Sequence, residues 1–388
     1  MLFRSTTFVG SRDRRLVKRC IEIFLQSKGD ETPWLQSRAP LPRDRPSLSD
    51  YPLLVLILAE WYGRLTGDDA FARRAAEPYG DLMRGVLAET SRGGLVASAY
   101  RMFVNHGYPV GQGRLAAYNA LVSGSLRAWA RLLKRAGGRS AEATASLAAA
   151  AKLDRWIAKE LWDEEASAFM DVRPEDSQHR GHGIQANAWT LLFTDLAGRK
   201  RDLALRRIAS ELGRFEPLRE AETVSPYTMF YLLGALYRHG SAGLAENAMR
   251  TVYQWMMERK TGTIWEHSDP KKSLSHAWST APNYYLSTRA LGVRMGFPEV
   301  DNLGEVLIAP ESETVDWARG AVPHPRGLVR VSWTVRGGEL FLDYSAPRGA
   351  RVRIEPRGRL AALRLRVNGR RVSRSTYCRS DGARLRAR

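Results

Sequence analysis

The sequence is poor in cysteine and lacks a long apolar run. Only two cysteines occur in 388 residues, Cys20 and Cys378. They are too few for a disulfide framework, so we expect a protein of a reducing compartment. The longest apolar stretch, residues 52–60, is far shorter than the roughly 20 residues of a bilayer span. No apolar segment of a secretory signal follows Met1. These absences predict a cytoplasmic protein with no membrane partner.

Motifs for cofactors and metals are also missing. Gly111 and Gly113 do not follow a strand pattern, as the glycines of a phosphate-binding loop do. His179 and His182 lack further ligands at a spacing that suits a metal. We therefore expect neither a cofactor nor a metal, and we interpret the two histidines as part of a solvated loop.

The positive charge is concentrated near the C-terminus. The formal net charge is +19, and residues 351–388 carry thirteen arginines against two acidic residues, a local charge of +11. The remaining charge is spread along expected helix faces. Because no nucleic-acid recognition motif accompanies these arginines, we expect no specific nucleic-acid partner. Nonspecific binding of polyanions by the basic tail stays open.

Most of the chain has helical periodicity. The expected helices span residues 16–26, 53–65, 70–87, 115–133, 141–161, 185–196, 203–212, 227–237, 244–257 and 275–291. Loops with Gly, Pro and Asp join these roughly ten amphipathic segments in antiparallel succession. No fixed repeat length is visible, which disfavours a solenoid. A helical toroid and a generic helical bundle both fit this pattern.

The composition changes after residue 298. Short β-branched or alternating runs separated by Gly and Pro turns predict strands at residues 305–308, 328–335, 339–344, 351–354 and 363–367. They predict a small antiparallel domain over residues 299–370. Beyond residue 371 the chain is highly charged and has few apolar residues. Such a segment buries too little surface to offset its ordering entropy, so we expect residues 371–388 to be a disordered basic tail.

The segment 261–287 combines a carboxylate with histidines and tryptophans. Glu266 directly follows Trp265 in an expected loop, and His276 and Trp278 come shortly after. In a sugar site, an indole covers the apolar face of a pyranose, while imidazole and carboxylate groups bind hydroxyls and activate water. The alternative interpretation is a surface Glu beside two core tryptophans.

Two ordered motifs resemble alpha-L-rhamnosidases. The first is Trp265-Glu266 followed by SLSHAW at residues 273–278, and the second comprises WARG at 317–320 and VPHPRG at 322–327. Weaker similarity reaches back almost to the start of the chain. The resemblance implies a mainly α fold, with an (α/α)6-type toroid of six helical hairpins over residues 1–298 and a small antiparallel β-sandwich after it. It also implies hydrolysis of terminal rhamnosyl groups in a rhamnose-containing glycoside.

The same resemblance assigns roles to the site residues. Glu266 matches the general base that activates water in an inverting mechanism, in which the two carboxyl groups lie about 6.5 to 9.5 Å apart. The resemblance implies that Trp265, His276 and Trp278 contact the substrate, with sugar platform and core packing both open for Trp278. On the expected helix, His276 and Trp278 are two residues apart and should point in different directions. We expect His267 to be exposed.

The sequence departs from the family near its start. The family's acid-rich segment, which carries the general acid, is not found, and roughly ten helices are too few for six hairpins. Asp13 and Asp50 are the candidates for the missing partner. We therefore expect an incomplete toroid. A truncated enzyme, a misassigned start and a silent carbohydrate-binding remnant are the open alternatives. The sequence leaves the oligomeric state open.

A second departure lies in MFVNHGYP at residues 102–109. The family has an Asp near the position of Asn105, which keeps the hydrogen-bonding shape but loses the charge. We predict that Asn105 and His106 contact sugar hydroxyls. A simple turn with Gly and Pro is the alternative.

Overall fold

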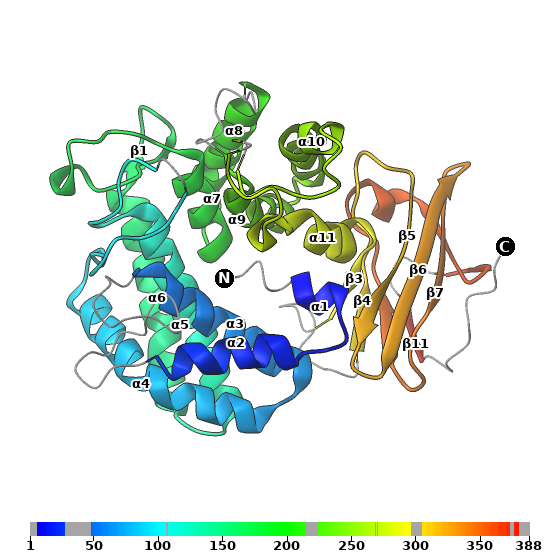
Figure 1. The fold of residues 1–388 in the computed structure, drawn as a ribbon, viewed down its shortest axis with the longest axis horizontal. Coiled ribbons are helices and arrows are strands. Elements are labelled where there is room, and N and C mark those ends of the chain that lie inside the picture. Colours follow the sequence, from blue (N-terminus) through cyan, green and yellow to red (C-terminus); the bar gives the residue numbers. More distant parts are fainter. Residues whose placement is uncertain are drawn as a thin grey trace.

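The computed structural model describes residues 6–27, 48–105, 108–214, 224–267, 269, 271–295, 305–372 and 376–379. Helices form a ring that occupies most of the molecule, and two β-sheets pack beside it (Figure 1). This order confirms the mainly α fold with a C-terminal β domain. Across the described ranges, no helix has both the length and the apolar character needed to cross a membrane. His106 lies outside the described residues.

The ring contains most of the expected helices. The α-helices are α1 (Thr6–Gly10), α2 (Arg15–Leu25), α3 (Asp50–Thr66), α4 (Asp69–Arg92), α5 (Ala116–Ala136), α6 (Ser140–Glu160), α7 (Ile184–Phe193), α8 (Arg199–Arg214), α9 (Pro226–Arg238), α10 (Ala242–Glu258) and α11 (Ala281–Tyr285). The expected helix over 275–291 is broken. It comprises a 3₁₀ turn, η3 (Ala277–Ser279), then α11 with Pro282 in its first turn, and a π-helical turn, η4 (Leu286–Ala290).

The helices are arranged in an inner and an outer set. Along the inner set, α3 packs on α5, α5 on α7, α7 on α9, α9 on α11, and α11 on α1. Helices α3, α5, α7 and α9 are buried on nearly all sides, as expected for helices that are apolar all round, whereas α8 and α10 bury one face. Helix α1, which is also part of the inner set, is only five residues long.

The C-terminal domain is a sandwich of two sheets around one apolar core. Its strands are β3 (Val293–Arg294), β4 (Glu305–Ile308), β5 (Trp317–His324), β6 (Gly327–Arg336), β7 (Glu339–Ser345), β8 (Arg351–Ile354), β9 (Arg364–Val367), β10 (Arg370–Arg371) and β11 (Thr376–Arg379). The sheet orders are β10-β9-β7-β6-β5 and β11-β8-β4-β3. A short hairpin of β1 (Trp162–Asp163) and β2 (Ala168–Phe169) lies in the helical part.

Four details of the β domain correct the sequence-based expectations. The sandwich is mixed rather than purely antiparallel, because β4 pairs with β8 and β7 with β9 in parallel. It begins earlier than residue 299, since β3 already pairs with β4. Strand β5 was missed, although its Pro323 suits the edge strand that β5 is. Four residues of the expected disordered tail form β11, which pairs with β8.

Buried charges join the ring to the β domain. Arg294 is fully buried, and its guanidinium donates to Glu311 at 2.8 Å and to the Thr288 carbonyl at 3.0 Å. Arg289, on the π-helical turn, reaches the same Glu311 oxygen at 3.4 Å. A buried ion pair that keeps its hydrogen bonds is stable, but loss of one partner leaves an uncompensated charge. These contacts fix where the chain leaves the ring and enters β3.

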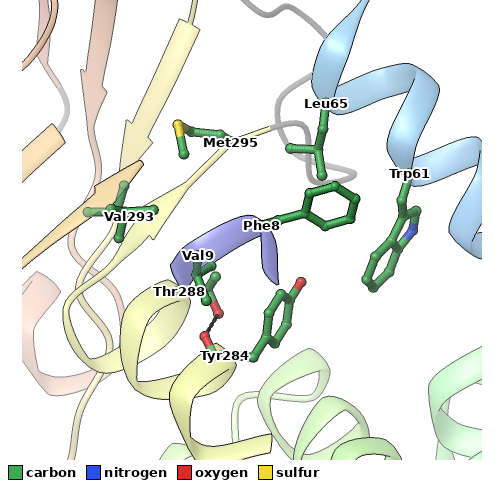
Figure 2. Close-up of a pocket in the computed structure, with 9 residues that line it drawn as sticks. Phe8, Val9, Trp61, Leu65, Tyr284, Thr288, Val293 and Met295 are labelled. Atoms are coloured by element: carbon green, nitrogen blue, oxygen red, sulfur yellow. Dashed lines mark hydrogen bonds between the residues drawn. The ribbon is translucent and has the colours of Figure 1, made fainter. Parts of the chain in front are cut away.

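A small apolar cavity lies at the same junction. Figure 2 shows Phe8 of α1 pointing toward Trp61 and Leu65 of α3, with Tyr284 and Met295 nearby. Its free space of about 20 Å³ is enough for about one water molecule. The cavity is too small for a sugar, and the residues of the 261–287 segment that were predicted to bind substrate do not line it.

Candidate active site

Glu266 lies in a loop that closes on itself. Its backbone N–H donates to the Ser273 carbonyl at 2.8 Å, and the Ser273 N–H donates to Glu266 Oε2 at 3.3 Å. The side chain is half-buried. The position in a loop agrees with the sequence-based expectation. The loop holds the carboxylate at the protein surface, where it can reach a substrate.

Trp278 connects this loop to two other elements of the ring. Its indole Nε1 donates to the Glu266 carbonyl at 3.2 Å. The indole stacks on Phe103 with ring centroids 5.7 Å apart and meets Tyr227 of α9 edge to face at 5.3 Å. Trp278 is half-buried. It is therefore packed against aromatic neighbours while the residue stays partly exposed, and its role as a sugar platform stays a prediction.

His276 lies against Trp278. Their ring centroids are 4.2 Å apart, and His276 Nδ1 accepts from the Trp278 N–H at 3.4 Å. The expectation that the two side chains point in different directions is wrong, because a short 3₁₀ turn replaces the predicted helix. Burial lowers the pKa of His276, and the nearby Glu266 charge opposes this shift. The imidazole is therefore mainly neutral at pH 7.

Two other residues of the segment belong to the core. Trp265 is 4% exposed, meets Trp255 edge to face, and donates from Nε1 to Thr261 Oγ1 at 2.9 Å. Its indole has no open face for a sugar in this structure. His267 is buried rather than exposed, and its Nδ1 accepts from the Asp269 N–H. Both side chains support the loop that carries Glu266.

Asn105 is buried and links two elements. Its Oδ1 accepts a hydrogen bond from Ser225 Oγ, and Ser225 is the N-cap of α9. This contact ties the 102–105 segment to the helix that carries Tyr227. The structure gives Asn105 a structural contact, and its predicted contact with a sugar hydroxyl stays a prediction.

Asp50, the first residue of α3, lies behind Phe103. The carboxyl is fully buried, its Oδ1 accepts from the Phe103 N–H at 3.0 Å, and its Oδ2 has no hydrogen-bond partner. Burial raises the pKa of Asp50 to about 7, against the opposing effect of the Phe103 hydrogen bond. Contacts therefore run from Glu266 through Trp278 and Phe103 to a carboxyl that is half protonated near neutrality.

Asp13, the other candidate for the catalytic partner, does not fit. It is exposed and pairs with Arg15 at 2.7 Å, and hydrogen bonds from Arg15 lower the pKa of Asp13 to about 2. A carboxyl with that pKa is ionised at neutral pH and holds no proton to donate.

A second polar cluster was not foreseen. Asp171 is buried and contacts His179 Nε2 at 2.8 Å and the Tyr108 hydroxyl at 2.8 Å. His182 Nε2 lies 2.8 Å from Asp163. Both histidines lie in the expected loop, but each is half-buried and paired with an aspartate rather than simply solvated. In the part of the chain that the structure describes, no group of three or more His, Cys, Asp and Glu side chains is placed to hold a metal ion.

Comparisons with known proteins agree with this architecture. The family model for the bacterial alpha-L-rhamnosidase C-terminal domain matches residues 292–359, which cover strands β3 to β8. No protein of curated function is significantly similar to the chain in sequence.

Several solved rhamnosidases share the fold. The GH78 family rhamnosidase of Bacillus sp. GL1 is 26% identical with a TM-score of 0.74, over 92% of this chain and 37% of that one. The alpha-L-rhamnosidase of Streptomyces avermitilis, complexed with L-rhamnose, is 16% identical with a TM-score of 0.72, over 91% and 34%. A Klebsiella oxytoca rhamnosidase with rhamnose bound is 19% identical with a TM-score of 0.57, over 70% and 53%.

The chain thus spans little more than a third of the Bacillus enzyme and about half of the Klebsiella enzyme. Similarity below about a quarter identity shows the fold alone, and this holds for the Streptomyces and Klebsiella structures. The Bacillus enzyme and the C-terminal family model add similarity in sequence. The Bacillus enzyme matches over both the ring and the sandwich, and the family model matches the sandwich. By these matches, residues 292–359 form an alpha-L-rhamnosidase C-terminal domain, and the chain as a whole is similar to GH78 rhamnosidases.

Proposed function

We propose that this protein is an alpha-L-rhamnosidase-like glycoside hydrolase that removes terminal rhamnosyl groups with inversion, with Glu266 as the general base. Trp278 and Phe103 stack on each other, and we call this pair the aromatic wall. The observation that carries the proposal is the placement of Glu266 and His276 beside this wall. The two relatives with rhamnose in their structures support a rhamnose-containing glycoside as the substrate.

Each group of this site has a function in that reaction. Glu266 would take a proton from water, which attacks the anomeric carbon as the glycosidic C–O bond breaks. Because His276 Nδ1 accepts from the Trp278 N–H, a neutral His276 carries its proton on Nε2 and would donate it to a sugar hydroxyl. The exposed part of the Trp278 indole would cover the apolar face of the ring. Inversion follows because water attacks from the face opposite the leaving group.

The leaving oxygen also needs a proton, which a general acid supplies in this mechanism. Asp50 has the proton affinity of a general acid, but its side chain is fully buried behind Phe103. We therefore assign Asp50 a positioning role, in which it holds the Phe103 backbone and through it the ring under Trp278. We assign no residue of this chain as the general acid.

A second candidate function is carbohydrate binding without cleavage. It is favoured by the poor fit of Asp13 and Asp50 to the acid role, since one is ionised and the other is buried. The two candidates differ in turnover but share the aromatic wall and the substrate class.

The decisive experiment combines turnover with binding. Purified protein is incubated with a chromogenic aryl alpha-L-rhamnoside, and free L-rhamnose is titrated by calorimetry. The hydrolase is supported if the aryl group is released and NMR shows that the first rhamnose formed is the β-anomer. Rhamnose binding without release favours the binding protein. Absence of both refutes both candidates.

Trp278→Phe should separate positioning from packing. The variant keeps an aromatic ring against Phe103 but loses the indole hydrogen bond to the Glu266 carbonyl. Such a bond contributes about 0.5 to 1.5 kcal/mol, so we expect turnover or rhamnose affinity to fall by about twofold to tenfold. Trp265→Phe is the matched control, because it loses one indole hydrogen bond to Thr261 instead. Equal effects in the two variants would argue against a special role for Trp278.

A further inference from the structure

A row of side chains crosses the five-stranded sheet on its outer face. Strand pairing aligns Trp317 with Thr334, Thr334 with Phe341, Phe341 with Arg366, and Arg366 with Arg371. Residues opposite each other on paired strands project from the same face. The row therefore includes one side chain from each of the five strands, β5, β6, β7, β9 and β10.

This face is directed to solvent. Trp317 is 68% exposed. Residues that alternate with the row, such as Val331, Trp333 and Leu340, are buried in the sandwich core. Trp333 fills the core and donates its indole N–H to the Ala290 carbonyl, but Trp317 contributes little to that core. An indole exposed to this degree on a regular strand has no folding requirement to explain it.

Charged and hydroxyl side chains extend the row into a surface. The same pairing places Arg319 beside Ser332 and Asp343, Arg330 beside Ser345, and Arg336 beside Glu339 and Arg364. We call this set, together with the row, the outer sheet face; it comprises Trp317, Arg319, Arg330, Ser332, Thr334, Arg336, Glu339, Phe341, Asp343, Ser345, Arg364, Arg366 and Arg371.

The outer sheet face has an excess of positive charge. It contains six arginines and two acidic residues. Glu339 is already held by Arg366 at 3.0 Å, Arg371 at 3.1 Å and Arg364 at 3.6 Å. Half of the excess charge therefore remains with the other three arginines, and two of these, Arg319 on β5 and Arg330 on β6, are exposed on the same side as Trp317.

We propose that the outer sheet face binds an anionic saccharide chain that carries uronate carboxylates. The exposed indole of Trp317 suits the apolar face of a pyranose. Arg319 and Arg330 offer planar guanidinium groups that pair with carboxylates. The hydroxyls of Ser332 and Thr334 match the hydroxyls of a sugar.

Asp343 distinguishes this ligand from a nucleic acid. It lies beside Ser332 and next but one to Arg319 across the sheet. Its carboxylate accepts hydrogen bonds from the free hydroxyls of a uronate chain. The sugars inside a DNA strand carry no free hydroxyl, and its phosphates are repelled. The surface is separate from Glu266, so its ligand is bound whether or not the ring cleaves a glycoside.

The test uses the full chain and polygalacturonate as the probe. Affinity electrophoresis or calorimetry at physiological salt compares it with dextran, a neutral polysaccharide, and with single-stranded DNA. We expect binding to polygalacturonate, weaker binding to DNA and none to dextran. Trp317→Ala and Arg319→Ala should each weaken binding about tenfold, since loss of such a contact corresponds to about 1.4 kcal/mol.

Exposed residues elsewhere provide matched controls. Met257 on α10 is 63% exposed, and the side chain of Arg199 on α8 is 78% exposed. Met257→Ala and Arg199→Ala should leave polygalacturonate binding unchanged. The proposal is overturned by absence of binding to polygalacturonate, by equal binding in Trp317→Ala, or by DNA binding as tight as that of the polysaccharide. Thermal unfolding confirms that each variant is folded.

Discussion

Replacement of Glu266 by Gln should lower the turnover of an aryl alpha-L-rhamnoside by about 10² to 10⁴, the usual contribution of a general base. The amide has the size of the carboxylate, and its oxygen can still accept from the Ser273 N–H. Because the loop and Trp278 stay in place, rhamnose affinity should change little. The measurement is kcat for the two proteins, with rhamnose binding by calorimetry.

Asp269→Asn is the matched control for Glu266→Gln. Asp269 lies three residues further along the chain, and its Oδ1 accepts from the Lys271 N–H. This change also removes one negative charge near the site but not the proposed base, so turnover should remain near the original value. Full activity in Glu266→Gln would remove Glu266 from the mechanism. Equal losses in both variants would indicate a general effect of loop charge.

Asp50→Asn should make the protein more stable above pH 7. Burial raises the pKa of Asp50 from 3.8 to about 7, so the folded state binds this proton more tightly than the unfolded state. Between about pH 4 and pH 7 the free energy of unfolding therefore falls by about 1.4 kcal/mol per pH unit from this group. The penalty approaches about 4 kcal/mol above pH 7. Asn carries no charge at any pH, so the substitution removes this penalty.

The measurement is denaturant unfolding of both proteins at pH 5 and pH 8. The free energy of unfolding of the variant minus that of the original protein should increase by about 3 kcal/mol from pH 5 to pH 8. Asp69→Asn is the control, since Asp69 is also the first residue of its helix but is exposed. A difference that does not change with pH would show that Asp50 is not protonated in the folded protein. If Asp50 positions Phe103, the Asn variant should retain turnover, because its amide oxygen still accepts from the Phe103 N–H.

Helices that are signalled by residues close together in the sequence were predicted correctly. The apolar run at residues 52–60 and the periodic segments that became α5, α6 and α10 are found at nearly the predicted positions. Asp68 accepts from the Phe71 N–H to begin α4, and Gly67 adopts the left-handed conformation that ends α3. Such signals involve residues a few positions apart, so they are readable without tertiary structure.

The segment after Glu266 shows where local reasoning fails. Residues 275–291 have helical periodicity, but the Trp278 indole bonds to the Glu266 carbonyl and stacks on Phe103, and the segment is divided among 3₁₀, α and π geometry. Trp265 and Trp278 both lie in the same short segment as Glu266, and the sequence does not distinguish their roles. Only packing against Trp255 places the first in the core, and packing against Phe103 leaves the second at the surface.

The sequence alone therefore determined the family resemblance, the order of ring and sandwich, and the loop position of Glu266, because motif order and periodicity depend on near neighbours along the chain. Tertiary structure alone decided the burial of Asp50 behind Phe103 and the pairing of Asp171 with Tyr108, which join residues 53 and 63 positions apart. Closing the ring brings these groups together and removes them from water. That desolvation raises the pKa of Asp50, and no sequence pattern around it records the partners that cause it.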